Sequence, residues 1–414
     1  MKKTKWINIG ILLLLPFVLP AQDPFADFLQ SVPVIEKIVS DAQFDSAGVT
    51  ITTERFVFKS RRQENSVYAI ISYPSKKGVY PAILFLHGGN GNAEGLAERL
   101  HRFAHNGYVA LAIDLPGICH PDKVPYSAGK WKKRTVSEKT ARFDVADSAA
   151  NSTLADGIIA AIEAFNLLAT WSNVDKRYMG ITGYSWGGYS TTMVASLLGG
   201  RVKAAYSVFG CGFYDKGSRW KNLLEKKSAE ERNTWLTYLD AGRRAGGMKA
   251  AYFIDGASND NFFWPPAVMA TLNAVASYKN HNWAPNYNHK QMPAGDSMQA
   301  IYFDYYLKNK GLPFGEIRLA GKEIYRNKYL RLTFKVNNPR GIQKKTAVLY
   351  YSRPEEDWTK RQWNAIVMKR RNKVRYTVDV PIGDPTAGNL YYGMFTDNRE
   401  VSVSSEMFDL NTLQ

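Results

Sequence analysis

One short glycine-rich segment limits what this chain can fold into more than any other feature. The sequence Gly-Tyr-Ser-Trp-Gly-Gly at 183–188 separates an apolar run, 178–182, from a helical pattern that begins near Tyr189. A strand that turns directly into a helix at a serine needs small flanking residues, because larger side chains would clash with the neighbouring strand and helix. The context predicts a tight, strained turn that exposes the hydroxyl of Ser185 at the end of a strand.

Strand-like and helix-like patterns alternate from about residue 45 to residue 310. The runs 82–86 and 109–113 are fully apolar, as is typical of strands buried on both faces of a sheet. We expect helices at 93–105, 153–168, 189–198 and 267–278. The alternation predicts an α/β fold with a mostly parallel sheet flanked by helices.

The pattern changes after Leu312 and Pro313. Apolar and polar residues alternate with a period of two over 330–336 and again over 376–382. Short strands of this kind, separated by polar turns, predict a small β-sandwich. We therefore expect an α/β domain at 22–313 and a C-terminal β-sandwich domain at 314–414.

The first 21 residues have the pattern of a secretory signal peptide. Lysines precede a short apolar stretch at 9–19, and Ala21 offers a small residue for cleavage. The stretch is too short for a membrane anchor, which needs about 20 apolar residues. We expect 1–21 to be removed on export, leaving a secreted or periplasmic protein with no stable membrane insertion.

Composition excludes several classes of protein. The formal net charge is +17, but the basic residues are scattered and no nucleic-acid-binding motif accompanies them, so we expect no nucleic-acid partner. Two cysteines, Cys119 and Cys211, rule out a disulfide framework and a cysteine-built zinc site, and leave open whether they pair. The sequence shows neither metal-spaced His/Asp clusters nor a phosphate-binding glycine loop. We therefore expect no metal and no cofactor.

A second glycine-rich segment, His-Gly-Gly-Asn-Gly at 87–91, follows the apolar run 82–86. If Ser185 is a nucleophile, such glycines let backbone N–H groups reach the oxyanion of a tetrahedral intermediate without side chains in the way. We predict that the N–H groups of Trp186 and Gly89 form this oxyanion hole. His87 is expected to hold the loop by hydrogen bonds.

A serine nucleophile needs a general base. Two of the six histidines, His281 and His289, follow the last of the helices expected above. We favour His289, because it lies between a proline-bearing strand end and another helix, which is the loop placement that a base needs. His281 is expected at the start of the strand, away from the nucleophile.

The base in turn needs a carboxylate that fixes its tautomer and stabilises its charge. Asp260 lies in the loop beyond an expected strand at 250–254, whereas Asp255 lies beside that strand. We therefore prefer Asp260 and predict a catalytic triad of Ser185, Asp260 and His289, in that chain order.

The triad order and the motifs around it resemble the α/β-hydrolase superfamily, and most closely its exported acetyl xylan esterase and dienelactone-hydrolase-like branch. The resemblance covers about 45–310 and is carried by 80–81, 87–89, Asp175, 183–188, 259–265 and 285–289. It implies an eight-stranded sheet and ester hydrolysis through an acyl-enzyme. Two features depart from the family pattern. The acid loop is one residue longer than the common Gly-x-x-Asp form, and no His-Glu pair stands at the base position, unlike the cephalosporin-deacetylase-like subgroup.

Tryptophans and basic residues suggest a class of substrate. The segment 115–145 is a basic insertion that contains Trp131, and Trp264 and Trp283 lie near the motif loops. Flat aromatic faces suit sugar rings, so we predict that these three tryptophans contact an acylated carbohydrate. The alternative interpretation is that the tryptophans fill the core and the basic run is a solvated loop.

Three hypotheses for function remain open at this stage. The leading one is an exported serine esterase, a carboxylic ester hydrolase acting on acyl (acetyl) esters of carbohydrate, with a small-molecule or polysaccharide ester as substrate. The second is a serine peptidase of the prolyl-oligopeptidase kind, and the third is a non-catalytic carbohydrate-binding protein on the same scaffold. The sandwich is expected to support the hydrolase domain, with carbohydrate binding through Trp358 or Trp363 as the alternative.

Overall fold

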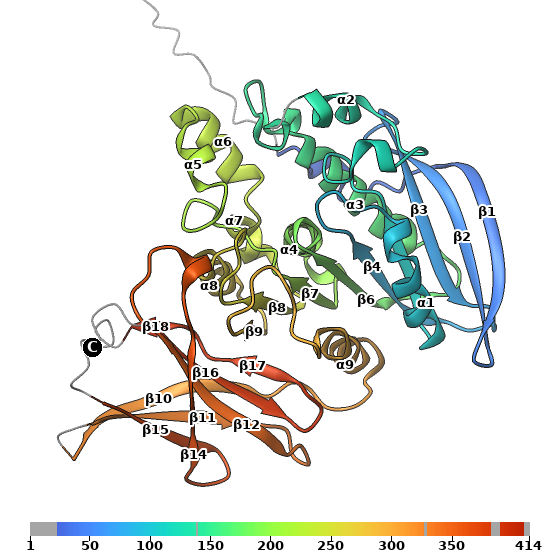
Figure 1. The fold of residues 1–414 in the computed structure, drawn as a ribbon. Coiled ribbons are helices and arrows are strands. Elements are labelled where there is room, and N and C mark those ends of the chain that lie inside the picture. The colour runs from blue at the N-terminus through green and yellow to red at the C-terminus, as the bar shows by residue number, and fades with distance from the viewer. Residues whose placement is uncertain (1–22, 138–139, 327–328, 382–389, 410–414) are drawn as a thin grey trace, which may run out of the picture.

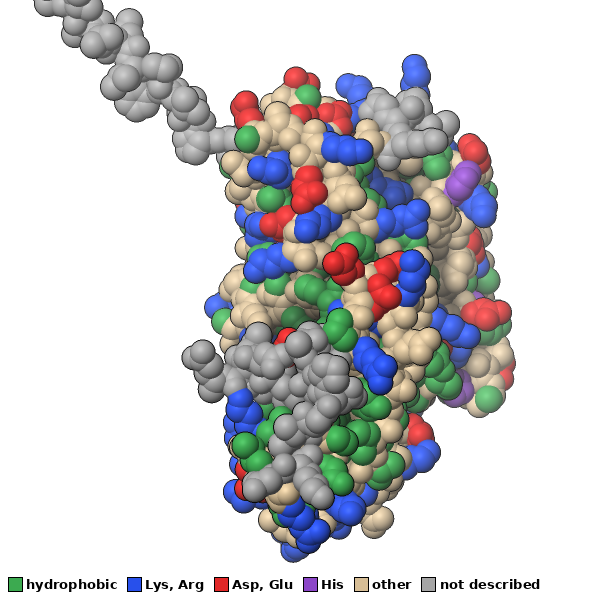
Figure 2. Space-filling view, turned by 60° about the vertical axis from the view of Figure 1, so that its left-hand side comes forward, with side chains coloured by type: hydrophobic (Ala, Val, Ile, Leu, Met, Phe, Trp, Pro, Cys, Tyr) green, Lys and Arg blue, Asp and Glu red, His purple; other side chains and the backbone are tan. Residues whose placement is uncertain are grey.

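A computed structural model describes residues 23–137, 140–326, 329–381 and 390–409. The predicted signal peptide therefore lies outside the described residues. Within those ranges, the helices are too short or too polar to cross a bilayer. Lys and Arg side chains are interspersed with Asp and Glu over the face drawn in Figure 2, as the scattered charge of the sequence suggested.

The larger part of the chain forms a nine-stranded sheet with the order β1-β2-β3-β5-β4-β6-β7-β8-β9 (Figure 1). The strands are β1 (Ile35–Ser46), β2 (Val49–Ser60), β3 (Asn65–Pro74), β4 (Tyr80–Leu86), β5 (Val109–Ile113), β6 (Val174–Tyr184), β7 (Ala204–Val208), β8 (Ala251–Ala257) and β9 (Lys279–Ala284). Pairing is parallel from β5 through β9 and antiparallel among β1, β2, β3 and β5. Every residue of β5 and β7 is buried, which explains the uninterrupted apolar sequence of β5. The predicted α/β fold with a mostly parallel sheet is confirmed.

The sheet has one strand more than the eight that the family resemblance implied. The additional strand is β1, which forms a long hairpin with β2 and lies at the edge of the sheet. Its side chains are exposed or half-buried on both faces, so its sequence carries no apolar alternation from which a strand could be predicted. Charged residues such as Glu36, Lys37 and Asp41 on this edge disfavour pairing with another chain.

Helices cover both faces of the sheet (Figure 1). The longer ones are α1 (Ala97–His105), α3 (Thr153–Leu168), α4 (Trp186–Leu198), α6 (Ala229–Tyr238), α8 (Pro265–Ala274) and α9 (Gly295–Lys308), and the shorter ones are α2 (Lys130–Ser137), α5 (Lys221–Glu225) and α7 (Ala241–Arg244). On one face α4 packs beside α3, and α7 packs against both α4 and α8. On the other face α1 and α9 meet through the rings of Phe103 and Phe303. The residue ranges expected from the sequence lie close to those of α1, α3, α4 and α8.

The C-terminal part is a β-sandwich built from two antiparallel sheets (Figure 1). One sheet contains β10 (Glu316–Tyr325), β11 (Tyr329–Asn337), β15 (Arg375–Pro381) and β14 (Lys369–Arg370), and the other contains β13 (Asn364–Val367), β12 (Lys344–Ser352), β16 (Leu390–Asp397), β17 (Ser402–Ser404) and β18 (Phe408–Asp409). The apolar residues of the alternating pattern, including Leu332 and Phe334, point into its core. The predicted boundary at 313 and 314 falls between α9 and β10.

The sandwich packs against the edge strand β9 of the large sheet. The Ser404 hydroxyl accepts the backbone N–H of Trp283 at 3.0 Å, and the imidazole of His281 is hydrogen bonded to the Ser405 carbonyl at 3.1 Å. These contacts cover the edge of β9, so the sandwich supports the α/β domain where its sheet would otherwise be open.

The alternative expectation is carbohydrate binding through exposed Trp358 or Trp363, and the structure contradicts it for Trp363. The Trp363 side chain is buried and its ring meets that of Tyr392 at 4.9 Å. Trp358 is half-buried and stacks under the guanidinium of Arg361.

Candidate active site

The turn at Ser185 has the strained geometry that its sequence predicted. Ser185 lies between β6 and α4 with φ +58° and ψ −117°, a backbone conformation that residues other than glycine rarely adopt. A Cβ atom at Gly187 would lie 2.1 Å from the Leu86 carbonyl oxygen, and one at Gly183 would lie 2.3 Å from the Gly187 carbonyl oxygen. Only glycine fits at these two positions, so the turn can close tightly and present the serine side chain.

The loop after β4 lies directly against this turn. A Cβ atom at Gly88 would lie 3.4 Å from the Cβ of Ser185, and one at Gly89 would lie 2.9 Å from the Cδ1 of Trp186. Trp186 is the first residue of α4, so its N–H has no partner within the helix. The structure thus brings both predicted oxyanion donors, Trp186 and Gly89, beside the serine.

His87 holds the oxyanion loop in place, as expected. Its Nε2 accepts the N–H of Leu115 at 2.9 Å, and its Nδ1 donates to the Gly88 carbonyl at 2.7 Å. Burial lowers the pKa of His87 to about 4. The imidazole is therefore neutral at pH 7 and acts as a structural link between the loops that follow β4 and β5.

The side chains of Asp260 and His289, the predicted acid and base, are hydrogen bonded to each other. The Nδ1 of His289 lies 2.8 Å from the Oδ2 of Asp260. The other carboxylate oxygen, Oδ1, accepts the backbone N–H groups of Phe262 at 2.7 Å and Phe263 at 3.0 Å. These bonds fix the carboxylate, and because it accepts the Nδ1 proton, the Nε2 of His289 is left as a free base.

His289 lies beside the turn that carries the serine. The hydroxyl of Tyr184, the residue before Ser185, donates to the His289 carbonyl at 2.9 Å. The His289 ring packs against the rings of Tyr184 and Phe209, at centroid distances of 5.5 and 4.6 Å. The three predicted triad residues therefore follow β6, β8 and β9 at the carboxyl edge of the parallel strands, where α/β folds place their sites.

The two rejected candidates have structural roles. Asp255 is buried within β8 and accepts hydrogen bonds from Gln291 and Asn282 at 2.7 and 3.2 Å. His281 is buried in β9, where burial lowers its pKa to about 4. The choice of Asp260 and His289 from their loop positions agrees with this geometry.

The prediction that three tryptophans contact the substrate is wrong for two of them. Trp131 is 1% exposed and packs with Cys119 and Val124, and Trp283 is 0% exposed beneath the sandwich. Burial of a large aromatic ring is energetically favourable, and the positions of these two tryptophans in the sequence did not indicate that they are buried. Trp264 is half-buried at the start of α8, where substrate contact remains a prediction.

Aromatic residues from two loops, the one that carries Asp260 and the one that follows β7, form a wall near His289. The ring of Phe262 lies 4.8 Å from that of His289, and the half-buried ring of Trp220 stacks against Phe262 at 5.9 Å. Trp220 also lies 4.6 Å from Trp186. Sequence reasoning missed Trp220, because it lies far from every motif and only the fold brings it here.

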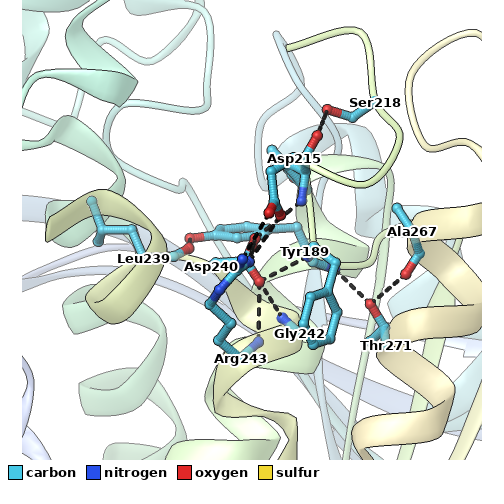
Figure 3. Close-up of polar contacts among 12 residues, drawn as sticks. Tyr189, Asp215, Ser218, Leu239, Asp240, Gly242, Arg243, Ala267 and Thr271 are labelled. Atoms are coloured by element: carbon cyan, nitrogen blue, oxygen red, sulfur yellow. Dashed lines mark hydrogen bonds and ion pairs between the residues drawn. The ribbon is translucent and has the colours of Figure 1, made fainter. Parts of the chain in front are cut away.

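A polar network fixes the loop that carries Trp220 (Figure 3). The buried carboxylate of Asp240 accepts the backbone N–H groups of Phe213 at 2.8 Å, Tyr214 at 3.1 Å and Gly242 at 2.9 Å. Arg243 in α7 pairs with Asp215 of the same loop at 2.8 Å. The loop after β7 is thus bound to α7, which holds the aromatic wall in place.

Within the described part of the insertion, 115–137 and 140–145, two of the basic side chains are bound to neighbouring groups rather than solvated. Arg142 donates to the Gly117 carbonyl at 2.7 Å, and its guanidinium lies 5.2 Å from the ring centroid of Trp186. Lys132 donates to the Val124 and Ser127 carbonyls. The solvated-loop interpretation is therefore wrong for these cations.

Cys119 and Cys211 are buried free thiols and do not pair. Across the described ranges, His, Cys, Asp and Glu side chains do not gather in a group of three or more that could hold a metal ion.

Comparisons with known proteins agree with this architecture. Residues 67–238 match the model of the dienelactone hydrolase family. The structure is similar to acetyl xylan esterase 1 from Thermoanaerobacterium sp. JW/SL YS485, with 19% identity, a TM-score of 0.57, and coverage of 70% of this chain and 95% of that one. It is equally similar to an acetyl xylan esterase from Paenibacillus sp. R4, with 19% identity, a TM-score of 0.57, and coverage of 69% and 92%. The structural similarity shows that the chain has an α/β-hydrolase fold, and within it the segment 67–238, less than half of the chain, matches the dienelactone hydrolase family.

The role of His87 predicts a loss of stability in acid. Its pKa is lowered on folding from about 6.5 to about 4, so its contribution is present above pH 6.5 and is lost as the pH falls towards 4. Between pH 7 and pH 4.5 we expect the wild type to lose about 2–3 kcal/mol more unfolding free energy than His87→Gln, which cannot titrate there. Urea unfolding at both pH values measures this difference. Equal losses in the two proteins would contradict the assigned role.

Proposed function

We propose that this α/β hydrolase is an exported serine esterase that removes acyl groups, most simply acetyl groups, from carbohydrate. The observation that carries the proposal is the Asp260–His289 pair at 2.8 Å beside the strained Ser185 turn and its glycine loop. A fixed carboxylate, an imidazole and a half-buried serine at the end of a strand together supply what acyl transfer requires. Two similar structures are named as acetyl xylan esterases, which supports an acetylated sugar as substrate.

The geometry supports a two-step reaction. The Nε2 of His289 takes the Ser185 hydroxyl proton as Oγ attacks the ester carbonyl carbon, and Asp260 stabilises the imidazolium that forms. The N–H groups of Trp186 and Gly89 bind the resulting oxyanion. The intermediate collapses as His289 gives its proton to the departing sugar oxygen, leaving an acyl-Ser185. A water molecule, deprotonated by His289, then releases the carboxylic acid.

The aromatic wall supports a sugar on the alcohol side of the ester. Trp220 and Phe262 of this wall, and Trp264 at the start of α8, are each half-buried, so each residue keeps some accessible surface. Flat rings with accessible faces suit the apolar faces of a sugar, whose hydroxyls then point towards solvent or polar groups. These rings replace Trp131 and Trp283 in the account of substrate binding.

Removing the nucleophile tests the proposal most simply. We expect Ser185→Ala to lower the turnover of p-nitrophenyl acetate by about 10⁴-fold or more, because neither acylation nor the acyl-enzyme can occur. Initial rates for wild type and variant, with circular dichroism as a check of folding, measure the effect. Equal turnover in the two proteins would contradict a role for Ser185, and cleavage of proline-containing peptides in place of esters would favour a peptidase.

The carboxylate can be tested without disturbing its loop. Asp260→Asn keeps an oxygen that can accept the N–H groups of Phe262 and Phe263 but loses the charge opposite His289. We expect kcat to fall by about 10³–10⁴-fold with a melting temperature close to that of the wild type. A variant that keeps most of its kcat would remove Asp260 from the mechanism.

Export is proposed from the sequence of 1–21 alone. Expression of the full chain in a Gram-negative host should give a product outside the cytoplasm whose N-terminus begins near residue 22. Fractionation followed by N-terminal sequencing measures both, and deletion of 2–21 should retain the protein in the cytoplasm. An uncleaved product in the cytoplasm would contradict export.

A further inference from the structure

One segment of the sandwich, 357–363, reaches the loops that carry the acid and the base. It contains the 3₁₀ turn η8 (Trp358–Lys360) and follows β12, and it is the orange segment close to α8 in Figure 1. The loop 258–261 carries Asp260 and the loop 284–289 carries His289. Backbone groups of 357–363 are hydrogen bonded to side chains in both loops, across 77 to 102 residues of sequence.

Asn259, the residue before Asp260, makes the first of these links. Its side chain is 5% exposed, and its Nδ2 donates to the backbone carbonyls of Arg361 at 2.5 Å and Thr359 at 3.4 Å. Its Oδ1 accepts the hydroxyl of Ser258 at 2.7 Å. The Asn259 amide is therefore satisfied on both sides, and a buried polar group of this kind is costly to leave unpaired.

Asn286, three residues before His289, makes the second link. Its Nδ2 donates to the Trp363 carbonyl at 2.9 Å, and its Oδ1 accepts the Trp363 N–H at 2.8 Å. Its φ of +60° is one that asparagine tolerates better than most residues. The paired bonds tie the base loop to one backbone position of the sandwich, and that position is held by the buried ring of Trp363.

The two catalytic loops are also bonded to each other. The N–H of Asn286 donates to the Ser258 hydroxyl at 2.9 Å, and the N–H of Asn259 donates to the Tyr287 carbonyl at 3.1 Å. The N–H of Asn261 donates to the side chain of Asn288 at 3.0 Å. The loop that carries Asp260, the loop that carries His289 and the sandwich segment 357–363 thus form one hydrogen-bonded unit. The sandwich segment supplies backbone groups to which side chains of both loops are bonded.

We propose that Asn259 and Asn286 are positioning residues through which the sandwich sets the distance and orientation between Asp260 and His289. The inference rests on the proposed function, since it assigns these residues to that same acid–base pair. A loop displaced by about 1 Å can cost a hundredfold in rate, because proton transfer requires close alignment. The sandwich is then a working part of the active site and not only a cover for β9.

The chain offers a matched control for this proposal. Asn280, in β9, is 7% exposed, and its Nδ2 donates to the Gly315 carbonyl at 2.8 Å, where the sandwich begins. It joins the same two domains through the same kind of bond, but lies in the strand and not in a catalytic loop. Loss of this bond weakens docking of the sandwich without freeing Asp260 or His289.

The experiment compares Asn259→Ala, Asn286→Ala and Asn280→Ala in the full mature chain, with p-nitrophenyl acetate as substrate. We expect the first two variants to lose about 10- to 100-fold in kcat with KM within about twofold of the wild type. Asn280→Ala should keep kcat within about twofold. Melting temperatures of all three, measured beside the kinetics, separate a shifted loop from a less stable protein.

The possible outcomes distinguish failure of this inference from failure of the proposed esterase function. A wild type without Ser185-dependent turnover would overturn both. An active wild type whose Asn259→Ala and Asn286→Ala variants keep full kcat, or lose no more of it than Asn280→Ala, would overturn the inference alone. If Asn286→Ala does not fold, Asn259→Ala carries the same test through the carbonyls of Thr359 and Arg361.

Discussion

The site depends on the close approach between the backbone of the Ser185 turn and the backbone at the end of β4. Gly187 lies so near the Leu86 carbonyl that a Cβ atom would come within 2.1 Å of it, and this contact joins the start of α4 to the end of β4. The same closeness forces Ser185 to a positive φ and places the loop 87–91 against it. The proposed nucleophile and oxyanion donors are therefore positioned by steric contacts of the backbone, before any polar contact contributes.

The acid and the base are positioned differently. Asp260 and His289 lie on loops, and loops depend on hydrogen bonds for a fixed geometry. Their bonds come partly from each other and partly from the sandwich, which follows both of these proposed catalytic residues in the sequence. A rigid turn on the sheet and a hydrogen-bonded pair of loops beside it together form the site, and the C-terminal domain is attached where the loops need support.

The sequence predicted the features that are local. Glycines around Ser185, and an aspartate and a histidine just beyond strand ends, identify positions in a parallel sheet without knowledge of packing. Features created by distant contacts were missed or misjudged. The strand β1 has no apolar alternation, Trp131 and Trp283 are buried, and Trp220 comes from a loop with no motif. The bond of Asn286 to Trp363 spans 77 residues, so its partner could not be found from spacing.

The central claim is that Ser185 is a nucleophile activated by His289. Treatment of the mature protein with a fluorophosphonate, followed by mass spectrometry of its peptides, tests this directly, because such reagents form a covalent bond with an activated serine. If Ser185 is the nucleophile, one adduct per chain forms on Ser185, and it is lost when His289 is replaced by alanine. An unlabelled protein, or an adduct on another serine, would contradict it.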